Sequence, residues 1–100
     1  MTDRELLEAA AKAAGIEFGW IHDTPRIRAE MGWTPWNPLT DDGDALRLAV
    51  TLGLVVDFSR PSAGEPYKQH HIWLDEHCDN ATLTRRAIVR AAAEIGRSMK

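Results

Sequence analysis

The sequence predicts an α+β fold, in which an antiparallel sheet of about four strands carries helices on both faces as an α/β/α sandwich. Three segments with helical periodicity are separated by two pairs of strand-like segments, which gives the order α-β-β-α-β-β-α. Turn-forming residues join the strands of each pair, as in antiparallel hairpins. The central helical segment is apolar on most sides, and such a helix is packed on most sides.

The first expected element is a helix over residues 3–14. Thr2 and Glu5 have the spacing of a capping box, in which each residue satisfies the backbone amide of the other. Apolar residues recur along one face of this segment and charged residues along the other. Gly15 follows as a natural C-terminal stop.

A hairpin is expected next, with strands over residues 17–22 and 26–33 around a turn at 22–25. The second strand alternates cleanly between polar and apolar residues, which is typical of a half-buried strand. The alternation predicts Arg26, Arg28 and Glu30 on one face, and Ile27, Ala29, Met31 and Trp33 on the other.

Two prolines make residues 34–39 an extended connector, because proline cannot donate a hydrogen bond and disfavours helical geometry in the residue before it. A helix over residues 42–52 follows, with Thr40 or Asp41 as its N-cap. The acids Asp41, Asp42 and Asp44 lie near the positive end of the helix dipole, so a helix start accounts for them without a ligand.

The second half of the chain repeats the pattern of two strands and a helix. In order, we expect a strand at 54–58, a loop at 59–66, a strand at 68–74, a polar connector at 75–80 and a final helix over about 81–98, capped by Asp79 or Asn80. The two halves share no sequence motif, so an internal repeat has only the order of elements to support it.

The size and composition of the chain are those of one globular domain, and we assign residues 1–100 to it. The one cysteine, Cys78, cannot form an internal disulfide, which favours a reducing compartment. No apolar run approaches the roughly 20 residues that cross a bilayer, and the N-terminus lacks the apolar core of a secretory signal. We therefore expect a soluble cytoplasmic protein with no membrane partner.

Two blocks of the sequence resemble a known family. WNPLTDDGDALRLAVTLGL at 36–54 and TRRAIVRAAAEIGR at 84–97 are similar to the small phage and prophage proteins of the phage ABA sandwich family, and Gly15-Ile16 after the first helix fits the same pattern. The resemblance implies a helix–sheet–helix layering and an origin in a tailed phage or prophage, hence a place in the host cytoplasm or the virion. The family is uncharacterised, so the resemblance implies no catalytic mechanism and transfers no site residues.

Tryptophans are the first candidates for a binding site. Trp33 and Trp36 lie at the connector that the prolines hold extended. In one interpretation both rings close the edge of the core. In the other, they and Asn37 form a preorganised aromatic anchor for a protein partner or for a second copy of the chain.

No metal site or cofactor is expected. The acids at 41–44 lack the repeated oxygen ligands and the closing glutamate of a calcium loop. A second polar cluster has the residue types of a zinc site but not the spacing, because adjacent residues of a strand point to opposite faces. The residues of this cluster are His70, His71, Asp75, His77 and Cys78.

No catalytic motif is found, so we do not expect an enzyme. Cys78 has His77 beside it, as a cysteine nucleophile has a base beside it. It lacks a third orienting residue, a glycine-rich elbow and an oxyanion motif.

Arginines give the alternative binding site. Residues 81–100 carry five Lys/Arg residues and one acid, and Arg86, Arg90 and Arg97 share one face of the expected helix. Arg85 and Arg86 lie in its first turns, where the helix dipole disfavours cations, so an anion should compensate them. The compensation comes from an acid of the same fold, such as Asp75, Glu76 or Asp79, or from solvent alone, or from a phosphate-bearing partner.

The leading functional hypothesis is a non-enzymatic accessory protein of a phage or prophage, which binds an unknown phage or host protein through Trp33, Trp36 and Asn37. Homo-oligomerisation through the same residues stays open. The alternative is nucleic-acid binding through Arg86, Arg90 and Arg97. We rank it second, because the chain has a net charge of −3 and nucleic-acid-binding domains are usually basic.

Overall fold

The computed structural model describes residues 2–66, 71–72 and 78–99. Within these ranges the chain forms three helices and six strands. In order they are α1 (Asp3–Ala14), β1 (Phe18–Ile21), β2 (Thr24–Ala29), β3 (Gly32–Pro35), α2 (Asp42–Leu52), β4 (Val55–Asp57), β5 (Ser62–Gly64), β6 (His71–Ile72) and α3 (Asn80–Ser98).

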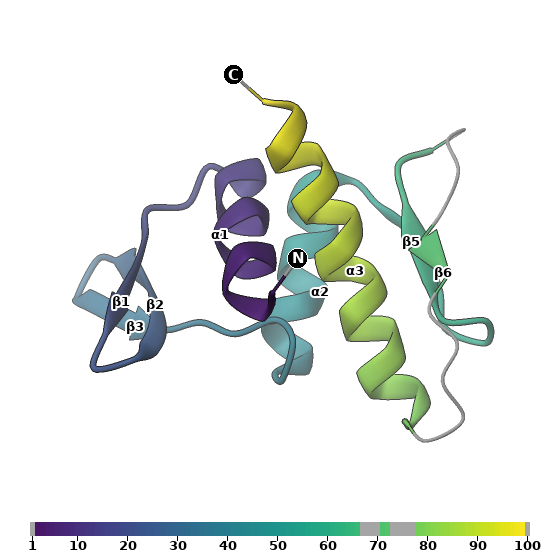
Figure 1. The fold of residues 1–100 in the computed structure, drawn as a ribbon, viewed down its shortest axis with the longest axis horizontal. Helices are drawn as coiled ribbons and strands as arrows, with labels where there is room; N and C mark the ends of the chain where they lie inside the picture. Colours follow the sequence, from purple (N-terminus) through teal and green to yellow (C-terminus); the bar gives the residue numbers. More distant parts are fainter. Residues whose placement is uncertain (1, 67–70, 73–77, 100) are drawn as a thin grey trace.

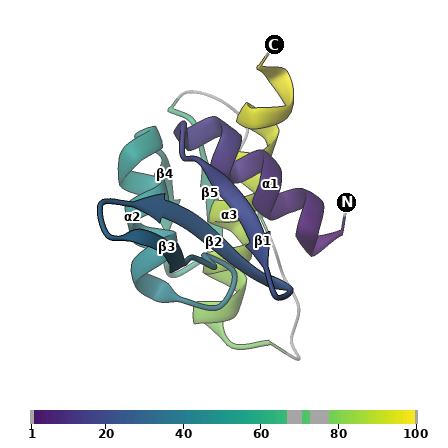
Figure 2. The same cartoon turned by 90° about the vertical axis from the view of Figure 1, so that its left-hand side faces the viewer.

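The strands form two separate sheets, and the helices lie between them (Figure 1). Each sheet is an antiparallel meander, with the strand orders β1-β2-β3 and β4-β5-β6. In Figure 2 the sheet of β1, β2 and β3 crosses in front of the helical layer. The predicted α+β class is therefore confirmed. The predicted α/β/α layering, with one sheet of about four strands between helices, is wrong for the described residues, because each half of the chain folds its own small sheet.

Helix α1 begins and ends where the sequence predicts. The Thr2 hydroxyl accepts a hydrogen bond from the Glu5 amide at 3.2 Å, and the Glu5 carboxylate accepts one from the Thr2 amide at 3.3 Å. These two contacts are the predicted capping box. Gly15 adopts a left-handed conformation, with φ of 69°, and ends the helix. The hydrogen bonds from Thr2 lower the pKa of the Glu5 carboxyl.

Helix α3 is the central element of the core. It contacts both other helices, α1 and α2, and the strands β4, β5 and β6 of the second sheet. Most of its buried residues are small, which lets neighbouring backbones approach closely. The fully buried positions of α3 and α1 include Ala87, Val89, Ala92 and Ala10.

The first sheet has one more strand than the sequence predicts. The alternating segment 26–33 is not one strand, because the chain turns after Ala29 and returns as β3. Gly32 allows this turn with a φ of 109°, and Met31 at the turn is 99% exposed. The turn reverses the predicted side of Trp33, which pairs with Arg28 and so points to the same face of the sheet.

The second sheet also differs from the prediction. The segment expected as a loop at 59–66 contains β5, whose middle residue Ala63 is fully buried beside α3. The tight connection from β4 is held by Asp57, whose carboxylate accepts a hydrogen bond from the Ser59 amide at 2.9 Å. Hydrogen bonds from the hydroxyl and amide of Ser59 and from the Arg60 amide lower the pKa of Asp57.

Helix α2 is packed on one side only. Its N-cap is Asp41, whose carboxylate accepts a hydrogen bond from the Asp44 amide at 2.8 Å. Ala45, Leu48 and Ala49 are buried, but Leu46 and Val50 are 56% and 72% exposed. The expectation that this helix is packed on most sides is therefore wrong. None of the helices among the described residues is long and apolar enough to span a bilayer.

Candidate functional site

Trp36 is part of the core and not an exposed anchor. Its side chain is only 4% exposed and packs edge-on against Phe18, with ring centroids 5.7 Å apart at 73°. Of the two interpretations of Trp36, the structure agrees with the one in which the ring closes the core, because the ring is buried against Phe18 of β1. Trp33 differs, since it is 38% exposed on the outer face of the first sheet.

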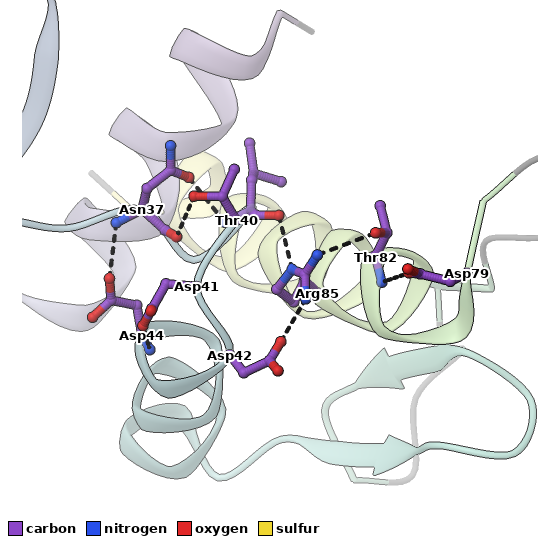
Figure 3. A network of polar contacts seen from close by, with 9 residues as sticks. Asn37, Thr40, Asp41, Asp42, Asp44, Asp79, Thr82 and Arg85 are labelled. Carbon is purple, nitrogen blue, oxygen red and sulfur yellow. Dashed lines mark hydrogen bonds and ion pairs between the residues drawn. The ribbon is translucent and has the colours of Figure 1, made fainter.

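Asn37 holds the connector against the start of α2. Its side-chain oxygen accepts a hydrogen bond from the Leu39 amide at 3.0 Å. Its backbone amide donates a hydrogen bond to the Asp44 carboxylate at 3.0 Å (Figure 3). The polar groups of Asn37, which the sequence analysis placed in a possible partner-binding site, are thus used inside the chain.

The acids at the start of α2 are each engaged within the chain. Asp41 caps the helix, and Asp44 accepts hydrogen bonds from Asn37 and from Arg47, the latter at 2.7 Å. Asp42 pairs with Arg85 of α3. In the part of the chain that the structure describes, no group of three or more His, Cys, Asp or Glu side chains is arranged to hold a metal ion. The zinc-like residues His70, Asp75 and His77 lie outside the described residues.

Arg85 ties α3 to the start of α2. Its Nε donates to the Leu39 carbonyl at 3.0 Å, and its two terminal nitrogens donate to Asp42 and to the Thr82 hydroxyl (Figure 3). The Arg85 side chain is only 17% exposed, so this cation has exchanged water for three protein acceptors.

The remaining arginines of α3 are also engaged within the chain. Arg86 pairs with Asp3 of α1 at 3.4 Å, and Arg90 and Arg97 interact with other groups of the protein. The predicted compensation by acids of the same fold is thus confirmed for Arg85 and Arg86, although the acids are Asp42 and Asp3. The expected acid Asp79 instead caps α3 and accepts from the Thr82 amide at 2.7 Å, which lowers its pKa.

An apolar groove runs between α2 and the first half of α3. It has a volume of about 320 Å³. The groove is lined by Asp42, Ala45, Leu46, Phe58, Asn80, Ala81, Thr84, Arg85 and Ile88. The ion pair of Asp42 and Arg85 forms part of this lining, so one charged group of each sign is held in place beside apolar side chains.

Large apolar side chains continue the groove onto the surface. Phe58, in the turn after β4, is 64% exposed. Leu46 and Val50 lie four residues apart on α2 and form an exposed stripe. The stripe of Leu46 and Val50 with Phe58 is called the α2 face below. The apolar character of residues 42–52 was the signal for it, but sequence alone did not separate a buried helix from one that presents an apolar side to a partner.

Comparisons of the chain with protein-family models, with curated proteins and with solved structures found no match.

Proposed function

We propose that the protein is a non-enzymatic protein-binding module whose docking surface is the α2 face and the groove beside it. The observation that carries this proposal is the exposure of Leu46, Val50 and Phe58 on one side of the molecule. Burial of large apolar side chains is the main favourable contribution to protein association. This docking surface differs from the one predicted from the sequence, which was the connector with Trp33 and Trp36.

The shape of the groove favours an inserted side chain of a protein over an enclosed small molecule. Its volume of about 320 Å³ is at the lower end of ligand pockets, and its apolar rim is open to solvent at Leu46 and Phe58. An aromatic or aliphatic anchor in such a groove, with a charged pair beside it, has the arrangement of an interface hot spot. Asp42 and Arg85 would then orient the partner through polar groups.

The origin and compartment that we propose come from the resemblance to phage ABA sandwich proteins. The blocks at 36–54 and 84–97 carry that resemblance. They support an accessory protein of a phage or prophage that acts in the host cytoplasm on a phage or host protein.

A photo-crosslinking residue at position 58 tests the proposal in cells that carry the phage or prophage. We expect a discrete crosslinked product, and we expect Leu46→Asp to abolish it, because a charge in the groove must be desolvated on binding. Met31→Asp is the matched control, since it makes the same kind of change at a residue that is 99% exposed and lies in the turn between β2 and β3.

Light scattering of the purified protein separates a foreign partner from a second copy. A dimer that Leu46→Asp dissociates would identify the chain itself as the partner. A monomer that yields no crosslink from position 58 under any condition would refute the proposal.

A further inference from the structure

The register of the first sheet brings one aromatic and two cationic side chains together on its outer face. Trp33 of β3 pairs with Arg28 of β2, and Arg26 pairs with Gly19 of β1. Residues directly opposite in antiparallel strands point to the same side, and residues two apart on one strand do so too. The inner side of this sheet is the one that carries Phe18, Trp20 and Ile27 to the core.

The indole of Trp33 lies across β2 between the two arginines. Its ring atoms Cη2 and Cζ3 reach to 3.5 Å from the point where Gly19 would carry a Cβ. Trp33 is level with Arg28 and Gly19 is level with Arg26, so the ring crosses the sheet diagonally. The ring thus occupies the space over Gly19, and 38% of the side chain stays open to solvent.

Within the described part of the chain, the two arginines lack the acidic partners that Arg85 and Arg86 have. Among the residues that the structure describes, Arg85 pairs with Asp42 and Arg86 with Asp3, but neither Arg26 nor Arg28 forms an ion pair. The Nε of Arg26 is buried and has no hydrogen-bond acceptor. A buried donor of this kind is a cost to the fold unless an acceptor arrives.

We propose that this outer face, formed by Trp33, Arg26 and Arg28, binds single-stranded nucleic acid. An unpaired base stacks on the open face of the Trp33 indole, and the flanking phosphates accept hydrogen bonds from the two guanidinium groups. An acidic peptide would use the two cations but would leave the aromatic platform without a role. A duplex would offer phosphates but no exposed base to stack.

The surface is independent of the groove beside α2. It lies on the other side of the helical layer from the second sheet, whose β4–β5 turn carries Phe58 (Figure 1). It also differs from the arginine face of α3, because it uses no residue of that helix.

Binding of a fluorescein-labelled oligothymidylate of about 12 nucleotides tests the proposal by anisotropy at low salt. We expect Trp33→Ala to weaken binding by roughly tenfold, as the loss of one base stack does, while Trp33→Phe retains most of it. We expect Arg26→Gln with Arg28→Gln to weaken binding as strongly and to flatten its salt dependence, because two phosphate contacts give a slope of about −1.4 in log–log form. The double variant leaves Trp33 in place, so it tests the surface even if Trp33→Ala unfolds the sheet.

Glu17 gives a variant with the opposite expected effect. Its carbonyl accepts a hydrogen bond from the Arg28 amide at 2.9 Å, so Glu17 lies opposite Arg28. Residues opposite each other point to the same face of a sheet, which places the Glu17 carboxylate beside the proposed surface. We expect Glu17→Gln to strengthen binding by about twofold or more, because a like charge near the phosphate is removed.

Three outcomes would overturn the proposal. One is the absence of oligonucleotide binding at low salt. Another is binding that survives the loss of Trp33, Arg26 and Arg28 but is abolished by Arg86→Gln with Arg90→Gln, which would place the site on α3. The third is equal competition by poly-glutamate with no effect of Trp33→Ala, which would identify a general anion or an acidic protein as the ligand.

Discussion

Gly96 of α3 lies directly against the backbone of Ala9 of α1. A Cβ atom added at Gly96 would lie 1.9 Å from the carbonyl oxygen of Ala9 and 2.8 Å from its carbonyl carbon. Because the obstacle is backbone, no change of side-chain rotamer relieves it. This contact sets the separation of the two helices whose alanine-rich faces make the centre of the core.

We therefore expect Gly96→Ala to destabilise the protein, although alanine is the better helix former by about 1 kcal/mol. Overpacking against backbone costs about 1–3 kcal/mol or more, so the clash outweighs the gain in propensity. Each kcal/mol of net loss lowers the thermal midpoint by roughly 4–8 °C in a domain of this size. Thermal unfolding followed by circular dichroism measures it, with Ser98→Ala as an exposed control on the same helix. An unchanged midpoint would mean that α1 and α3 can move apart to admit the methyl group with no loss in the free energy of unfolding.

Trp33 and Trp36 should differ in their access to iodide. Trp36 is 4% exposed and Trp33 is 38% exposed, so iodide should quench emission from Trp33 and spare that of Trp36. We expect Trp33→Phe to reduce the quenchable fraction of the fluorescence and Trp36→Phe to increase it. The opposite result, with less quenching after Trp36→Phe, would place Trp36 on the surface.

Arg85 should contribute more to stability than its ion pair alone. Arg85→Met leaves the Leu39 carbonyl without its donor, which costs about 1–3 kcal/mol, whereas Asp42→Asn removes an exposed charge and costs at most about 1 kcal/mol. Arg85→Lys should recover only part of the loss, because an ammonium group does not match three acceptors as a guanidinium does. Denaturant unfolding of the two single variants and the double variant measures the coupling. Equal effects of Arg85→Met and Asp42→Asn would contradict the role of the Leu39 carbonyl.

The N-cap of α3 should make stability depend on pH in the acid range. The Thr82 amide holds the pKa of Asp79 below its ordinary value of 3.8, so the folded state favours the ionised carboxylate. That contribution is complete above the ordinary pKa and is lost as the pH falls through the lowered one. Asparagine caps a helix as well but does not titrate. As the pH falls from about 5 to about 2, we expect the free energy of unfolding to decrease less in Asp79→Asn than in the wild type. Urea unfolding at each pH measures it. Parallel profiles would show that Asp79 is not coupled to folding.

Local chemistry explains which elements the sequence predicted well. The ends of α1 and the start of α2 depend on residues within four positions of one another, such as the Thr2–Glu5 capping box and the Asp41 cap. Those contacts form wherever the helix lies in the fold, so spacing alone identifies them.

The sheets were harder to predict because strand pairing is not local. The alternation of residues 26–33 gave no sign that the chain turns at Glu30 and Met31, and the glycine after them was the one signal of a break. Because of that turn, Trp33 lies on the same face of the sheet as Arg28 and not on the opposite face. The alternation alone therefore did not predict the outer face of the first sheet.

The candidate sites failed for a related reason. Trp36 and Leu46 are both large and apolar, yet the first is buried and the second exposed. Their burial is set by which side of the chain faces α1 and α3, and residue type carries no information on that.

The turn between β1 and β2 leads to the last prediction. Ile21 pairs with Thr24, so His22 and Asp23 form a two-residue loop, and both have positive φ, at 52° and 60°. Two-residue hairpin loops with this geometry prefer Asn followed by Gly, because other residues are strained in the left-handed region. We expect His22→Asn with Asp23→Gly to raise the free energy of unfolding by about 0.5–1 kcal/mol, measured by denaturant unfolding. Asp23→Pro is the contrasting variant and should destabilise the hairpin, since proline cannot adopt a positive φ. A stabilising effect of proline would mean that the loop has another geometry and that the register of β1 and β2 differs.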